Sequence, residues 1–167
     1  MNAFVVDTNV AVVANARGQH PVECVAASAR ALNGCREGVV VIDQGMHIFN
    51  EYRRYLSFRG QPGVGDAFLR WLCDNLGTVH CERVELKTDE AGNFTDFPSD
   101  PALEGFDRSD RKFVATARAS RNSPVILNAV DSDWRGFAEP LARHGVQVKT
   151  LCAASERPSR RRGNTRV

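Results

Sequence analysis

Carboxylate, hydroxyl and amide side chains stand together at the end of the first apolar run of the chain. Residues 3–6 are Ala-Phe-Val-Val, and Asp7, Thr8 and Asn9 follow them directly. Acidic residues recur in three later segments, at Glu51, Asp107, Asp110, Asp131 and Asp133. The first question is therefore what chemistry these acids would support if the fold brought them together.

Carboxylates that lie within about 4–6 Å of one another disfavour their charged forms unless a cation neutralises them. Hard oxygen donors of this kind favour Mg²⁺ or Mn²⁺. Two such ions can activate a water molecule, hold a phosphodiester and stabilise the leaving oxygen. The acids therefore indicate metal-dependent phosphodiester chemistry, provided that they converge.

Each acid also has a purely structural interpretation. The pairs at 107/110 and 131/133 can cap the helices that follow them or interact with the helix dipoles. Glu51 can be a solvated helix residue. Asp7 is the hardest to explain in this way, because the end of a buried strand is a costly place for an unpaired acid.

The spacing of apolar residues predicts strands and helices in alternation. Strands are expected at residues 3–7, 39–43, 78–86, 124–130 and 146–151. Helical segments are expected at residues 8–16, 21–36, 44–60, 66–77, 107–120 and 131–145, the last with Pro140 as a point of kinking. Residues 87–106 have no clear period and predict a long loop, of the kind that is often functional. This order indicates a three-layer α/β/α sandwich with a mainly parallel central sheet, in which ligands bind beyond the carboxyl ends of the strands.

Length and charge predict one domain with a short basic extension. The 167 residues suffice for one core, and no apolar run approaches the roughly 18–20 residues of a membrane span. The N-terminus carries no basic leader of the secretory type. The net charge is +2, and removing the five arginines of residues 157–167 leaves residues 1–156 at −3. We expect a folded domain over residues 1–152 and a disordered basic tail over 153–167, either solvated or in contact with nucleic-acid phosphates.

The five cysteines are scattered along the chain and include no C-x-x-C motif. An odd number with this spacing favours reduced thiols in a cytoplasmic protein over a disulfide framework or a zinc site. We therefore expect a cytoplasmic protein with free cysteines.

Four segments in a fixed order carry a family resemblance. They are "FVVDTNV" near the N-terminus, "FNEY" around Glu51, "DRSDRKFVATA" and "VILNAVDSDW". Together they resemble the PIN-domain family, especially its bacterial VapC-like toxin ribonucleases, over residues 3 to about 150. The resemblance implies a PIN-like fold that hydrolyses RNA phosphodiester bonds with a metal-activated water.

The resemblance also implies roles for individual residues. The catalytic, metal-binding acids would be Asp7, Glu51, Asp110 and Asp131, which would hold one or two Mg²⁺ or Mn²⁺ ions. The auxiliary residues would be Thr8, Asn9, Asp107, Asn128 and Asp133, the last as an additional metal ligand and Thr8 or Asn9 as hydrogen-bond donors to the carboxylates or to a metal-bound water. Basic residues for phosphate contacts would be Arg53, Arg54, Arg59, Arg108, Arg111 and Lys112. The implied partners are an RNA substrate, a small inhibitory antitoxin and a second copy of the chain, with no membrane.

Three other interpretations remain open. A PIN-like domain with weak catalysis would serve only to bind RNA or protein. A receiver-like phosphoacceptor domain shares the parallel sheet, but it would place an acidic pair directly after the first strand, where Asp7 stands alone. A haloacid-dehalogenase-type phosphatase would need D-x-D at this point, and "DTN" lacks the second acid.

Overall fold

The computed structural model describes residues 1–153, which form a parallel sheet between two layers of helices. The strands are β1 (Ala3–Val6), β2 (Val39–Asp43), β3 (Cys81–Val84), β4 (Val125–Asn128) and β5 (Val148–Thr150). The helices are α1 (Thr8–Ala14), α2 (Val22–Cys35), α3 (His47–Tyr55), α4 (Val64–Asn75), α5 (Arg111–Ala119), α6 (Ser132–Gly136) and α7 (Ala138–Arg143), with 3₁₀ turns η1 (Pro101–Leu103) and η2 (Arg108–Asp110). The predicted α/β sandwich is confirmed, and the sheet is parallel throughout.

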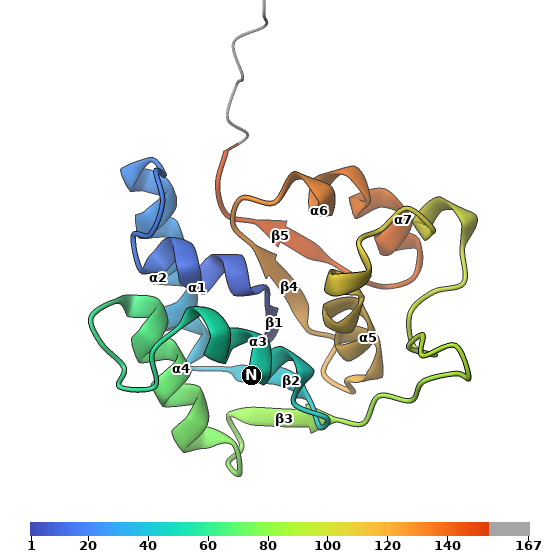
Figure 1. Cartoon of the computed structure of the whole chain (residues 1–167), viewed down its shortest axis with the longest axis horizontal. Coiled ribbons are helices and arrows are strands. Elements are labelled where there is room, and N and C mark those ends of the chain that lie inside the picture. The colour runs from blue at the N-terminus through green and yellow to red at the C-terminus, as the bar shows by residue number, and fades with distance from the viewer. Residues whose placement is uncertain (154–167) are drawn as a thin grey trace, which may run out of the picture.

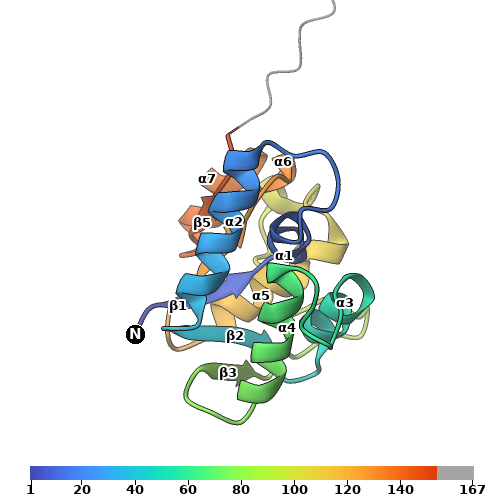
Figure 2. The same ribbon diagram turned by 90° about the vertical axis from the view of Figure 1, so that its left-hand side faces the viewer.

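The sheet has the order β3-β2-β1-β4-β5, so the first strand of the chain lies at its centre. Helices α1 to α4 lie on one side of the sheet, and α5 and α7 lie on the other (Figures 1 and 2). Strands covered on both faces must be apolar at every position rather than at alternate ones. β2 meets this condition at its first four residues, Val39 to Ile42, and its last residue, Asp43, is a buried acid.

The third strand is shorter than the sequence predicts. Strand character was expected over residues 78–86, but β3 spans only Cys81–Val84. Thr78 begins a turn instead, in which its hydroxyl donates to the backbone carbonyl of Asn75. At the other end, Val84 pairs with Asp43, the last residue of β2, so the neighbouring strand offers no further partner. The length of β2 therefore limits this edge strand.

Pro140 divides the last predicted helix. The segment 131–145 forms two helices that meet at Phe137, and Pro140 is the third residue of the second one. A proline in the first turn of a helix gives up an N–H that has no helical partner in any case. The expected kink is thus a complete break three residues before the proline.

The expectation that all cysteines are reduced is wrong for two of them. Cys24, in the first turn of α2, forms a disulfide with Cys152, just after β5, with 5.0 Å between their Cα atoms. Cys35, Cys73 and Cys81 are free. The two bonded residues are 128 positions apart, so only the tertiary fold brings them together and no local spacing predicts the pair.

Residues 154–167, which include most of the predicted basic tail, lie outside the described residues. Within residues 1–153, none of the helices combines the length and the apolar character that crossing a bilayer requires.

We expect the Cys24–Cys152 disulfide to raise the free energy of unfolding, because it closes a loop of 128 residues in the unfolded chain. Loss of a native disulfide typically costs about 2–5 kcal/mol. Thermal unfolding of the double variant Cys24→Ser/Cys152→Ser should show this loss, whereas Cys73→Ser, which removes a free thiol, should unfold like the wild type. Titration of the denatured, unreduced protein should count three thiols; a count of five would contradict the pairing.

Candidate functional site

The carboxyl edge of the sheet gathers polar side chains from neighbouring strands. Val6 pairs with Leu127, so Asp7 and Asn128 stand next to each other one position further on. The amide of Asp7 donates to the carbonyl of Leu127 at 3.0 Å, which extends the ladder to the acid itself. Asn128 pairs in turn with Thr150 at the end of β5. β1, β4 and the edge strand β5 therefore bring an acid, an amide and a hydroxyl to the carboxyl edge of the sheet.

Asp7 is buried, with 5% of its surface exposed, and both of its carboxylate oxygens accept hydrogen bonds. Oδ1 accepts from the backbone amide of Asn9 at 2.9 Å, which caps α1, and Oδ2 accepts from the indole Nε1 of Trp134 at 2.7 Å. Burial raises the pKa of Asp7 to about 6 against the lowering effect of these two bonds, and the charges of Glu51 and Asp131 add to the rise. The carboxylate is thus oriented by the fold but only weakly compensated in charge.

Glu51 reaches the same region from α3. This helix packs its buried face of Ile48, Phe49 and Tyr52 inward, and the Tyr52 hydroxyl donates to the carbonyl of Val6, the residue before Asp7. Glu51 itself accepts from the Thr8 hydroxyl through Oε2.

The other oxygen of Glu51 meets a cation. Oε1 lies 3.1 Å from Nζ of Lys112, whose side chain is 11% exposed. Thr8, predicted to bind a carboxylate, therefore does so, and Lys112 joins α5 to α3.

Asp110 and Asp131 complete the set of four acids. Burial raises the pKa of Asp110 to about 7, and the charges of Asp7 and Asp131 raise it further while Lys112 lowers it. Asp131 is the N-cap of α6 and accepts from the amide of Asp133 at 2.9 Å. The structure thus brings acids from separate segments into electrostatic contact, as the sequence analysis expects, and Asp131 is a helix cap as well as a member of the cluster.

The side chains of Asn9 and Asn128 hydrogen-bond to each other and so connect the start of α1 to the end of β4, and neither side chain contacts a carboxylate of the cluster. The side-chain amide of Asn9 donates to Oδ1 of Asn128 at 2.8 Å, and its oxygen accepts from the amide of Ala129 at 2.8 Å. Asn128 also donates to the carbonyl of Asp131 at 2.9 Å and accepts from its amide at 3.1 Å. The pair fixes the turn that carries Asp131.

The two remaining predicted acids are exposed. Asp107 caps η2 through the amide and hydroxyl of Ser109, and the hydrogen bond from that hydroxyl is the main cause of its lowered pKa. Asp133 lies on the outer side of the first turn of α6. Asp107 acts on the cluster only through its charge, which adds to the raised pKa of Asp110.

Two basic residues expected to contact phosphates are engaged within the protein. Arg111 donates to the carbonyls of Glu104 and Phe106, and its guanidinium carbon lies 4.5 Å from the centre of the Phe97 ring. Lys112 is paired with Glu51. Arg108, by contrast, is exposed and lines a cavity of about 640 Å³ that is formed largely by the loop at residues 89–104 and that none of the four acids lines.

The carboxylate oxygens of the four acids suit a hard divalent cation, but in this structure they are not arranged as a complete metal site. Within residues 1–153, no group of three or more His, Cys, Asp or Glu side chains is arranged to hold a metal ion. The pKa values of Asp7 and Asp110 are nevertheless raised, mainly by burial and further by the charges of neighbouring carboxylates, and a bound cation relieves this penalty on the charged forms. Carboxylate oxygens are also the ligands that Mg²⁺ and Mn²⁺ prefer. Asp7, Glu51, Asp110 and Asp131 are therefore the residues that would hold such an ion.

Sequence reasoning missed two members of this site. Trp134 appears in the sequence analysis only as the last residue of the "VILNAVDSDW" motif, and Lys112 only as a phosphate contact. A buried indole usually donates its N–H to a hydrogen-bond acceptor. A tryptophan close in sequence to the predicted acids therefore indicates that a carboxylate can be this acceptor. The Lys112–Glu51 pair spans 61 positions, and the sequence carries no comparable indication of it.

Comparisons with protein-family models, with curated proteins and with solved structures find no match for this chain. The fold and the site define it in structural terms, as a parallel α/β sandwich with an acidic cluster at the carboxyl edge of its central strand. The resemblance of its motifs to PIN-domain ribonucleases stays a prediction.

Replacing Trp134 by Phe should lower the free energy of unfolding by roughly 1–3 kcal/mol, because Asp7 then loses the donor to a buried oxygen. Urea unfolding measures this loss. Trp71→Phe, at a partly exposed position of α4, is the matched control and should cost less. Equal losses of free energy of unfolding in the two variants would show that the hydrogen bond from Trp134 to Asp7 does not contribute to stability.

The raised pKa values of Asp7 and Asp110 predict how stability changes with pH in the metal-free protein. The folded state binds more protons than the unfolded chain between about pH 4 and pH 7, so these two acids destabilise the protein progressively as the pH rises through this window. Asp110→Asn removes one of them. After allowance for solvent near this partly exposed group, it should stabilise the protein by roughly 2 kcal/mol at pH 8 and much less at pH 5.

Urea unfolding at both pH values in the presence of a chelator tests this prediction. Asp74→Asn, at an exposed position of α4 paired with Arg70, is the control and should show no such pH-dependent gain. If Asp110→Asn raised the free energy of unfolding more at pH 5 than at pH 8, the raised pKa of Asp110 would be wrong.

Proposed function

We propose that this chain is a Mg²⁺- or Mn²⁺-dependent endoribonuclease of the PIN-domain class, which hydrolyses RNA phosphodiester bonds. The observation that carries the proposal is the convergence of Asp7, Glu51, Asp110 and Asp131 on one sheet edge, where Asp7 and Asp110 have pKa values raised to about 6 and 7. Strongly perturbed acids in such a cluster are typical of functional sites. The position of the cluster, beyond the carboxyl ends of the central strands, is where parallel α/β folds bind their ligands.

The side chains around the cluster have distinct roles in this proposal. Trp134 and the amide of Asn9 hold the Asp7 carboxylate in one orientation, and Thr8 does the same for Glu51. The bound ions would supply an activated water and charge stabilisation of the phosphodiester, so no side-chain nucleophile is required. Arg108 is exposed and begins the 3₁₀ turn that ends at Asp110, and it is the basic residue that we expect to contact a phosphate of the substrate.

The motif resemblance extends the proposal to the biological setting. We propose that the protein is the toxin of a toxin–antitoxin pair, acts in the cytoplasm, is inhibited by a small antitoxin protein that covers the acidic site, and forms a homodimer. The toxin role, the antitoxin and the homodimer depend on the resemblance of "FVVDTNV", "FNEY", "DRSDRKFVATA" and "VILNAVDSDW" alone. The cytoplasmic location depends on the three free cysteines, and the Cys24–Cys152 disulfide is an observation against it.

The Lys112–Glu51 ion pair favours one alternative, a PIN-like module that binds RNA or protein with weak catalysis. Lys112 already provides Glu51 with a cation, and within residues 1–153 no group of three or more His, Cys, Asp or Glu side chains is arranged to hold a metal ion. A protein of this kind would bind RNA without cleaving it, whether or not a divalent metal is present.

A cleavage assay distinguishes the two functions. The wild type should cleave single-stranded RNA with Mg²⁺ or Mn²⁺ and not with a chelator. Because loss of a group that only supports a metal ligand typically costs 10–100-fold in activity, loss of a ligand itself should reduce the rate by at least about 100-fold. We therefore expect Asp7→Asn and Asp110→Asn to show such losses, and the exposed Asp74→Asn to cleave like the wild type.

Near-ultraviolet circular dichroism should accompany the assay, since Asp7→Asn also removes an acceptor of the Trp134 indole. Asp110→Asn leaves that contact intact and is the cleaner variant. Cleavage that survives both substitutions, or that needs no metal, would show the mechanism to be wrong.

A further inference from the structure

A buried lysine lies inside the acidic cluster. Lys112 is 9% exposed, whereas the other two lysines of the chain, Lys87 and Lys149, lie at the surface. Lysines are almost never fully buried unless they are paired, since removing an ammonium from water is costly. The position of Lys112 therefore needs a reason, and its contacts provide one.

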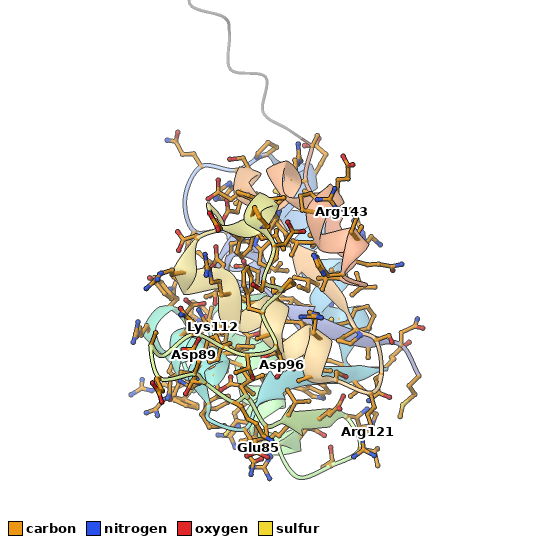
Figure 3. All side chains as sticks on the ribbon, turned by 90° about the vertical axis from the view of Figure 1, so that its right-hand side faces the viewer. Glu85, Asp89, Asp96, Lys112, Arg121 and Arg143 are labelled. Carbon is orange, nitrogen blue, oxygen red and sulfur yellow. A yellow bond between two sulfur atoms is a disulfide. The ribbon has the colours of Figure 1, made fainter. Side chains whose placement is uncertain are left out.

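The ammonium of Lys112 bridges two parts of the site. Nζ lies 3.1 Å from Oε1 of Glu51 and also donates to the backbone carbonyl of Ser109, the residue before Asp110. Figure 3 labels Lys112 among the side chains drawn as sticks. It lies 4.6 Å from the centre of the Phe113 ring, a favourable position for a cation. Its charge also lowers the pKa of Asp110. One ammonium thus stabilises acids from α3 and from the start of α5.

We infer that Lys112 is the resident counter-cation of the acidic cluster and that it releases Glu51 when a divalent cation binds. This inference rests on the proposed metal site. While Lys112 is in place, one oxygen of Glu51 is taken by the ammonium and the other by the Thr8 hydroxyl. The ammonium therefore occupies the Glu51 oxygen that the Thr8 hydroxyl leaves open, and a divalent ion that binds this oxygen competes with Lys112 for it.

Charge balance favours exchange over simple addition. The four acids carry up to four negative charges and Lys112 a single positive one, so a further cation is attracted to the cluster. An ammonium and a divalent ion that share one carboxylate repel each other, however, and this repulsion is strong where water is excluded. The lysine side chain has a flexible four-carbon stem and can leave without a change of the backbone. Arg111 cannot follow the same path, because its guanidinium is bound to the carbonyls of Glu104 and Phe106.

Amine labelling followed by peptide mass spectrometry tests the exchange in the wild-type protein. A brief pulse of an acylating reagent modifies lysines in proportion to their exposure, and the chain has only three. With a chelator, Lys112 should be labelled slowly and Lys87 and Lys149 quickly. With MnCl₂, labelling of Lys112 should rise several-fold while the two surface lysines stay unchanged; NaCl at the same ionic strength should have no effect.

Two variants sharpen the test. Glu51→Gln removes the charged partner, so Lys112 should label quickly in the chelator and respond little to MnCl₂. Lys112→Met removes the competitor, so calorimetric titration should show Mn²⁺ binding several-fold tighter than in the wild type. Tightening below twofold in a folded Lys112→Met variant would contradict the exchange.

The outcomes separate this inference from the proposed function. If calorimetry shows that the wild type binds Mn²⁺ while the labelling of Lys112 does not change, the exchange is wrong and the metal site stands. If the wild type binds no Mn²⁺, both are wrong. If the wild type binds Mn²⁺ and only the labelling of Lys112 rises, the exchange is supported.

Discussion

The hydrogen bonds to the buried carboxylate of Asp7 are the interaction on which the site depends. Asp7 ends the central strand, caps α1 through the amide of Asn9, and receives the indole N–H of Trp134 from α6. One side chain thus connects three elements that lie more than 120 positions apart at their extremes. Burial makes the charged form of Asp7 unfavourable and raises its pKa to about 6. The metal-free protein would therefore be more stable if a proton or a cation neutralised this carboxylate.

A second set of polar contacts determines where the other acids lie. The Asn9–Asn128 pair fixes the turn that leads to Asp131, and the Tyr52 hydroxyl fixes α3 against the end of β1. Neither contact involves a carboxylate oxygen of the cluster directly. The positions of α3 and of the Asp131 turn therefore depend on neutral amide and hydroxyl groups, whose hydrogen bonds do not require a charged carboxylate.

The sequence predicts the fold well because a strand that is buried on both faces of the sheet is a continuous run of apolar residues in the sequence. The run Val39–Asp43 is apolar at every position before its acid, and such runs alternate with helical periods along the chain. Three of the four acids, Asp7, Asp110 and Asp131, are predictable for a related reason, since they stand at the ends of these segments, whereas Glu51 lies inside α3 and is indicated only by the motif resemblance. The ion pair of Lys112 and the disulfide of Cys24 are not predictable, because each joins residues whose neighbours in sequence carry no sign of the partner.

The contact between Trp134 and Asp7 has one more consequence, for spectroscopy. Trp134 is fully buried and is one of two tryptophans in the chain, and its indole N–H is bonded to the most deeply buried acid of the cluster. Indole emission responds to charge and hydrogen bonding at the ring, whereas Trp71 lies on α4 in the opposite helical layer. The protein thus contains a native fluorophore at its acidic site, which reports the charge state of Asp7 without any added label.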